Sequence, residues 1–101
     1  MSVRSGGVSK PPMDTLNLGD HVGDDPEAVR LNRGRLCAHL GIATAFLHQT
    51  HGEGVQHLSA ASVGGPRLSG DIAITTTRGI AATIMVADCL PILFVHQRLP
   101  L

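Results

Sequence analysis

The sequence has little charge, no marked excess of either sign and no long apolar run. Charged residues make up 16% of the 101 residues, and eight basic residues balance eight acidic ones. The local basic cluster Arg30, Arg33 and Arg35 is typical of a solvated helix face, so it does not predict a surface for nucleic acid or an anionic membrane. No stretch approaches the roughly 18 apolar residues that span a bilayer. Residues 1–12 also lack the apolar core of a signal peptide, so we expect a cytoplasmic protein.

The sequence is also poor in cysteine, with only Cys37 and Cys89. In a chain without a secretion signal, two cysteines predict free thiols and not a disulfide framework. We find no internal repeat and no low-complexity segment. Apolar residues make up 43% of the chain, and its length suits one domain, so the composition indicates a globular fold.

One helix is predicted from its boundary signals. Asp25 is a favoured N-cap residue, Pro26 suits the first helical position, and Gly41 suits the position after the last turn. These signals predict a helix from about Pro26 to Leu40. The residues before it are rich in glycine, proline and aspartate, which favour a loop packed on the domain.

Short strand-like pieces follow the predicted helix. A small, polar segment at 59–70 separates them and indicates a surface loop. One helix followed by several strands predicts mixed helix and sheet content, with the sheet in the second half. The last piece would leave an apolar strand uncovered, so we expect a truncated domain. The pieces are 45–48, 54–57, 72–76, 80–86 and 91–95.

A polar interruption, "ADCLP", lies between the last two strand-like pieces. The run from Ile80 to Val86 is typical of a buried strand. Pro91 cannot donate a hydrogen bond to a sheet, so the backbone has to bend before it or lie at an edge. Asp88 and Cys89 are therefore predicted at a break between strands, where their side chains are available for chemistry.

The stretch "LHQTHGEG" supplies the most promising of the six histidines. Glycines argue against a helix there, and in a strand His48 and His51 would face opposite sides. His51, at the strand end, is the stronger candidate. Together with Cys89 it fits a thiol nucleophile with an imidazole base, or a zinc or copper site. The alternative is that Cys89 is a small buried apolar residue.

Four stretches carry a family resemblance: residues 4–36, "QTHG" at 49–52, "GDIAIT" at 70–75 and "ADCLPILF" at 87–94. In this order, they resemble the laccase-domain family of the YfiH type. Members of that family have been called multicopper polyphenol oxidoreductases, purine nucleoside phosphorylases and peptidoglycan editing factors. The resemblance implies an α+β fold related to the cysteine hydrolases, with mixed β-sheets packed with helices. It also implies that residues 1–101 are the N-terminal portion of a single laccase-type domain, incomplete at the C-terminus.

The resemblance further implies a metal site, usually zinc, with copper as a possible alternative. His51 and Cys89 match two of the family's ligands, and Asp88, beside the cysteine, matches a position in or around the same pocket. The third ligand of the family is a histidine downstream of the cysteine, and the sequence ends before that motif. A catalytic zinc normally has three protein ligands, and we do not expect His96 to replace the missing one. Arg4 and Asn17 match positions in or around the pocket, with Arg4 as the candidate for binding phosphate.

The function implied by the resemblance is metal-dependent purine nucleoside chemistry. It comprises phosphorolysis of adenosine, inosine or methylthioadenosine and deamination of adenosine, so the expected partners are a purine nucleoside and phosphate. Two alternatives remain open. One is a hydrolase in which Cys89 and His51 edit peptidoglycan precursors, and the other is an inactive fragment. A multicopper oxidase would need more metal ligands than this sequence offers.

Overall fold

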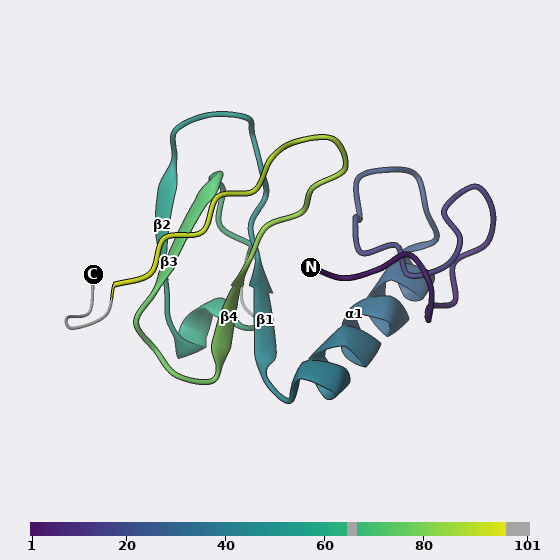
Figure 1. Cartoon of the computed structure of the whole chain (residues 1–101), viewed down its shortest axis with the longest axis horizontal. Helices are drawn as coiled ribbons and strands as arrows, with labels where there is room; N and C mark the ends of the chain where they lie inside the picture. Colours follow the sequence, from purple (N-terminus) through teal and green to yellow (C-terminus); the bar gives the residue numbers. More distant parts are fainter. Residues whose placement is uncertain (65–66, 97–101) are drawn as a thin grey trace. The chain divides into compact units, whose positions relative to one another are not determined.

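A computed structural model describes residues 1–64 and 67–96 of the chain. It forms two compact units, residues 1–41 and the chain from residue 42 onward. The first unit holds the helix α1, Pro26–Leu40, and the described part of the second holds four short strands (Figure 1). Among the described residues, no helix has the length and apolarity to cross a membrane. The prediction of one helix followed by several strands is confirmed.

Helix α1 has the boundaries that its sequence predicts. The Asp25 carboxylate accepts a hydrogen bond of 3.1 Å from the Glu27 N–H, which satisfies one donor of the first turn. Gly41 has a φ of 71° and donates its N–H to the Cys37 carbonyl at 2.8 Å. Only glycine adopts this left-handed conformation readily, so the helix ends here.

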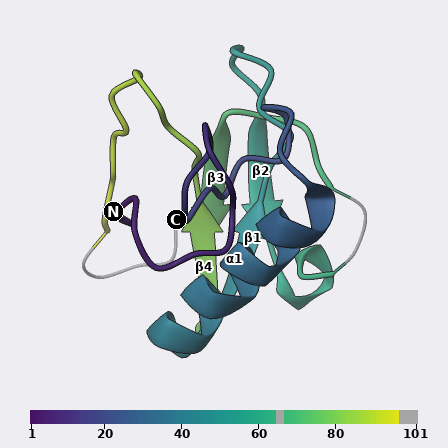
Figure 2. The same cartoon turned by 90° about the vertical axis from the view of Figure 1, so that its right-hand side faces the viewer.

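A buried asparagine on α1 holds the N-terminal segment, which runs along the helix in Figure 2. Asn32 is fully buried, and its side-chain oxygen accepts a hydrogen bond of 2.8 Å from the Val8 N–H. Its amide nitrogen donates to the Ser9 hydroxyl and the Asn17 carbonyl, both at 2.8 Å, and to the Thr15 carbonyl at 3.2 Å. One side chain therefore bonds to four residues of the segment before the helix.

The prediction of a solvated basic face on α1 is wrong for Arg33. Its side chain is only 18% exposed, and its Nε donates to the Leu18 carbonyl at 2.8 Å. Arg35 donates to the Gly6 carbonyl at 2.9 Å, whereas Arg30 is exposed and pairs with Glu27 on the same helix. Arg33 and Arg35 thus donate hydrogen bonds to carbonyl groups of the N-terminal segment. Sequence spacing does not reveal such long-range partners.

The second unit contains two small parallel sheets. Strand β1, Ala43–Phe46, pairs with β4, Ile80–Thr83, in the register Ala43↔Ile80 to Phe46↔Thr83. Strand β2, Val55–Leu58, pairs with β3, Ile72–Thr75, and a 3₁₀ turn spans Ala60–Ser62. The two described sheets are thus parallel and not mixed as expected. Three buried side chains form the core of this unit: Ala45, Leu47 and Leu58.

The predicted strand at 91–95 is wrong. Residues 91–96 have no regular secondary structure, and Ile92, Leu93 and Phe94 are 71%, 86% and 80% exposed. A strand needs a neighbour to complete its hydrogen bonds, and Pro91 has no N–H to donate. No strand among residues 1–64 and 67–96 pairs with this segment. The other four predicted pieces correspond to β1 to β4, with boundaries shifted or shortened.

We predict that Asn32→Ala destabilises the first unit by about 2 to 3 kcal/mol, because it leaves buried backbone groups without partners. The higher helix propensity of alanine offsets only about 0.5 kcal/mol of this loss. Urea denaturation followed by the helical circular dichroism signal measures the change.

Arg30→Ala is the matched control on the same helix, since it removes only an exposed ion pair with Glu27. It should change the free energy of unfolding by less than about 1 kcal/mol. An equal loss in both variants would contradict the role assigned to Asn32.

Candidate functional site

The parallel pairing of β1 with β4 brings two of the sequence motifs to one edge of the sheet. Paired parallel strands have their carboxyl ends at the same edge, where α/β proteins commonly bind ligands. His51 lies five residues after Phe46, the last residue of β1, and Cys89 lies six residues after Thr83, the last of β4. The two following loops leave the sheet at the same end (Figure 1). We call the loops 47–54 and 84–90 the edge loops.

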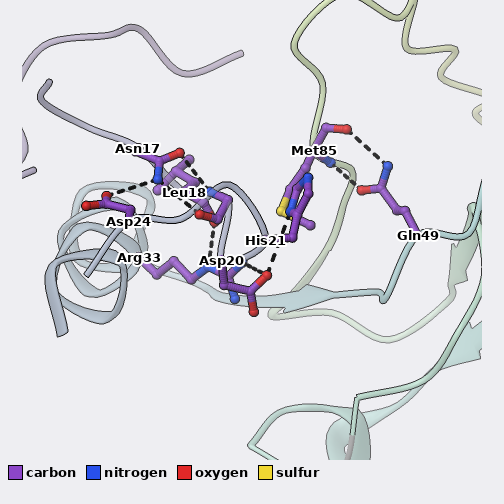
Figure 3. A network of polar contacts seen from close by, with 9 residues as sticks. Asn17, Leu18, Asp20, His21, Asp24, Arg33, Gln49 and Met85 are labelled. Atoms are coloured by element: carbon purple, nitrogen blue, oxygen red, sulfur yellow. Dashed lines mark hydrogen bonds and ion pairs between the residues drawn. The ribbon is translucent and has the colours of Figure 1, made fainter. Parts of the chain in front are cut away.

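The Gln49 side chain joins the two edge loops directly (Figure 3). Its Oε1 accepts a hydrogen bond of 2.7 Å from the Met85 N–H, and its Nε2 donates to the Met85 carbonyl at 3.1 Å. This pair of hydrogen bonds resembles the pair that one residue of a β-sheet makes with a residue of the adjacent strand. The pairing therefore fixes the start of the "QTHG" motif against the segment that leads to Asp88 and Cys89.

The carboxylate of Asp71 gathers the backbone around His51. Its Oδ1 accepts from the His51 N–H at 2.9 Å, and its Oδ2 accepts from the Gly52 N–H at 2.9 Å. Oδ2 also accepts from the Thr50 N–H and hydroxyl, both at 3.1 Å. Three consecutive N–H groups thus point at one side chain, an arrangement that stabilises negative charge.

The backbone of residues 70 and 71 closes the same loop from its other side. The Asp71 N–H donates to the Gly54 carbonyl at 3.1 Å. A Cβ on Gly70 would lie 2.8 Å from the Gly54 carbonyl oxygen, so this close approach requires glycine. Asp71 is therefore bonded to the loop through both its backbone and its side chain.

Hydrogen bonding lowers the pKa of Asp71 from the ordinary value of 3.8 to about 2. The Gly52 N–H contributes most, and the N–H groups of His51 and Thr50 and the Thr50 hydroxyl add to it, while partial burial opposes the shift. All these donors favour the charged form. Asp71 is therefore a carboxylate at neutral pH and not a proton donor.

The comparisons with known proteins agree with the motifs. Residues 1–100 match the family described as multi-copper polyphenol oxidoreductase laccase. The chain belongs to this family. It is 42% identical over 104 residues to a purine nucleoside phosphorylase of Mycobacterium tuberculosis, covering 96% of this chain and 40% of that protein. It is 47% identical over 94 residues to one of Pseudomonas aeruginosa, covering 93% of this chain and 37% of that protein.

Solved structures of similar proteins support the fold. The protein NMB0706 of Neisseria meningitidis matches with a TM-score of 0.77 at 42% identity, over 85% of this chain and 35% of that one. YfiH of Bacillus licheniformis matches with a TM-score of 0.67 at 25% identity, over 73% of this chain and 32% of that one. The chain thus spans about 40% of the length of its curated relatives.

Among the residues that the laccase-family resemblance singles out, three lie on the edge loops. His51, Asp88 and Cys89 are all exposed, so Cys89 is not the buried apolar residue of the alternative interpretation. Among the described residues, neither Cys37 nor Cys89 forms a disulfide, as predicted. The described part of the chain contains no group of three or more histidine, cysteine or acidic side chains that could hold a metal ion. The metal-binding roles of His51 and Cys89 stay predictions.

Arg4 and Asn17 lie in the first unit and make contacts within their own loop. The Arg4 Nε donates to the Asp14 carbonyl at 2.7 Å, and its guanidinium lies 3.3 Å from the Asp14 carboxylate. The Asn17 amide nitrogen donates to the Gly19 carbonyl and to the Asp24 carboxylate, both at 3.0 Å (Figure 3). Both side chains thus stabilise the N-terminal segment, and their substrate-binding roles stay predictions.

Sequence reasoning missed Gln49 and Asp71 as residues that organise the edge loops. Both lie in the motifs that carried the family resemblance, Gln49 in "QTHG" and Asp71 in "GDIAIT". Asp71 follows a glycine at the start of a strand, which is a signal for a close backbone approach. Their partners lie 36 and 19 to 21 positions away in the sequence, so local pattern could not identify them.

We predict that the Asp71 hydrogen bonds break as the pH falls through about 2. Because the folded pKa is depressed, the carboxylate stabilises the loop above the unfolded value of 3.8 and loses that effect as it becomes protonated. The amide proton shifts of Thr50, His51 and Gly52, followed by NMR, should move together with this midpoint. A shared midpoint near 3.8 would contradict the structure, and Asp71→Asn should abolish the transition.

Proposed function

We propose that this chain forms part of a metal-assisted purine nucleoside phosphorylase. The observation that carries the proposal is the in-register parallel pairing of β1 with β4, which brings the loops of His51 and Cys89 to one edge. Support for the substrate class comes from relatives 42% and 47% identical that are named purine nucleoside phosphorylases. A purine nucleoside and phosphate are thus the proposed substrates.

The donor chemistry of the edge loops suits zinc, and copper is the alternative. An exposed imidazole and an exposed thiol are ligands that both metals accept. His51 and Cys89 are two donors, and a catalytic zinc normally takes three from the protein. The described residues therefore do not complete such a site. In our proposal His51 and Cys89 hold zinc weakly in this chain, so the assay supplies the metal in excess.

Phosphorolysis requires phosphate and the nucleoside to be bound together, with a phosphate oxygen facing C1′ of the ribose. An oxygen of phosphate forms a bond to C1′ of the ribose, the bond from C1′ to the purine nitrogen breaks, and the purine leaves with a proton. We propose that the exposed guanidinium of Arg4 binds the phosphate, since this group matches phosphate geometry. Asp88 lies beside Cys89 in the second edge loop and is a further proposed catalytic residue, while solvent supplies the proton that the leaving purine takes. Deamination of adenosine is the second reaction we propose.

The test is phosphate-dependent release of the purine base. Purified chain supplied with zinc is incubated with inosine, adenosine or methylthioadenosine, and free base and ribose 1-phosphate are quantified by chromatography. We expect release that requires phosphate and falls at least about 100-fold in Cys89→Ala, because a missing ligand abolishes the site. Formation of inosine from adenosine reports the deamination.

Cys37→Ala is the matched control, because it removes the other thiol of the chain and should leave the rate unchanged. Absence of phosphate-dependent release from the chain would contradict the proposal, as would equal rates in the Cys89→Ala variant. Release that continues without phosphate, and without metal, would indicate a hydrolase instead.

A further inference from the structure

We propose that Asp71 is the positioning residue for His51, holding the backbone of the "QTHG" motif so that the imidazole keeps one direction at the sheet edge. The positioning role is inferred from the geometry of the loop, and its use in binding a metal rests on the proposed function.

The first observation is the backbone conformation of His51. Its φ is 61°, in the left-handed region that residues with a Cβ rarely adopt. This conformation costs a side-chain-bearing residue roughly 1 to 2 kcal/mol and persists only where the surroundings enforce it. His51 is exposed, so packing does not enforce it, and hydrogen bonding has to do so.

The second observation is that one carboxylate supplies those hydrogen bonds. Asp71 accepts from the N–H groups of Thr50, His51 and Gly52, which lie before, at and after the strained position. Three N–H groups can converge on one carboxylate only if the backbone curls around it. The charge of Asp71 therefore selects the left-handed conformation of His51, and with it the direction in which the imidazole leaves the backbone.

The third observation is that Asp71 is itself held firmly. Its N–H bonds to the Gly54 carbonyl, and the next residue, Ile72, begins β3. The carboxylate is thus anchored to a sheet strand, while the residue it positions lies in a loop. Hydrogen-bonded groups behind a metal ligand orient that ligand, and their loss typically weakens metal binding by about 10- to 100-fold.

The test compares the zinc affinity of three single variants of the full chain with that of the parent chain, by competition with a chelator. We expect Asp71→Asn to weaken zinc binding at least about tenfold. Glu53→Gln is the matched control, since it removes one negative charge from the same loop at an exposed position, and it should leave the affinity within about twofold. Thr50→Val removes only the hydroxyl donor to Asp71, so a smaller loss of about threefold is expected.

A double variant separates positioning from a general disturbance. If Asp71 acts through His51, Asp71→Asn should cause no further loss of zinc affinity in a His51→Ala background. Unchanged affinity in Asp71→Asn alone, or an equal loss in both backgrounds, would overturn the proposal. Far-UV circular dichroism identifies variants that fail to fold. If Asp71→Asn does not fold, the zinc affinity of Thr50→Val tests the proposal in its place.

An NMR measurement keeps this inference distinct from the proposed function. A positive φ gives a strong NOE between the His51 amide proton and its own Hα, and this signal should be present in the parent chain and lost in Asp71→Asn. If the parent chain binds no zinc, the metal proposal fails. The positioning role is then tested by the NOE alone. A strong NOE that persists in Asp71→Asn would overturn it.

Discussion

The parallel pairing of β1 with β4 is the constraint on which the candidate site depends. Ala43 to Phe46 lie against Ile80 to Thr83 without a register shift, so both strands end at the same level. The chain then leaves the sheet twice at one edge, once toward His51 and once toward Cys89. A shift of one residue would turn the following side chains to the opposite face, because side chains alternate along a strand.

Two polar side chains fix the conformation of the two edge loops that follow these strands. Gln49 bonds both backbone groups of Met85 and so holds the two edge loops together beyond the end of the sheet. Asp71 bonds three consecutive N–H groups and sets the backbone around His51. Neither residue is a predicted metal ligand, yet each restricts the positions that a ligand can take.

The sequence predicted those features that local chemistry decides. Helix α1 matches its prediction at both ends because Asp25, Pro26 and Gly41 act on their immediate neighbours. The burial of Asn32 and the partial burial of Arg33 were not predicted, because their partners lie 15 to 24 positions away. The strand at 91–95 was predicted from apolar character alone, which cannot supply the neighbour that a strand needs. His51 and Cys89 were found through their motifs, whereas Asp71 became recognisable only from its contacts.

The most direct test of this account is X-ray absorption spectroscopy of the zinc-loaded chain at the zinc edge. If the edge loops bring His51 and Cys89 to one metal ion, the first shell contains one sulfur at about 2.3 Å and nitrogen at about 2.0 Å. Cys89→Ala should remove the sulfur and leave the lighter atoms. A shell of oxygen and nitrogen alone in the parent chain would contradict the central claim that these two loops form one metal-binding site.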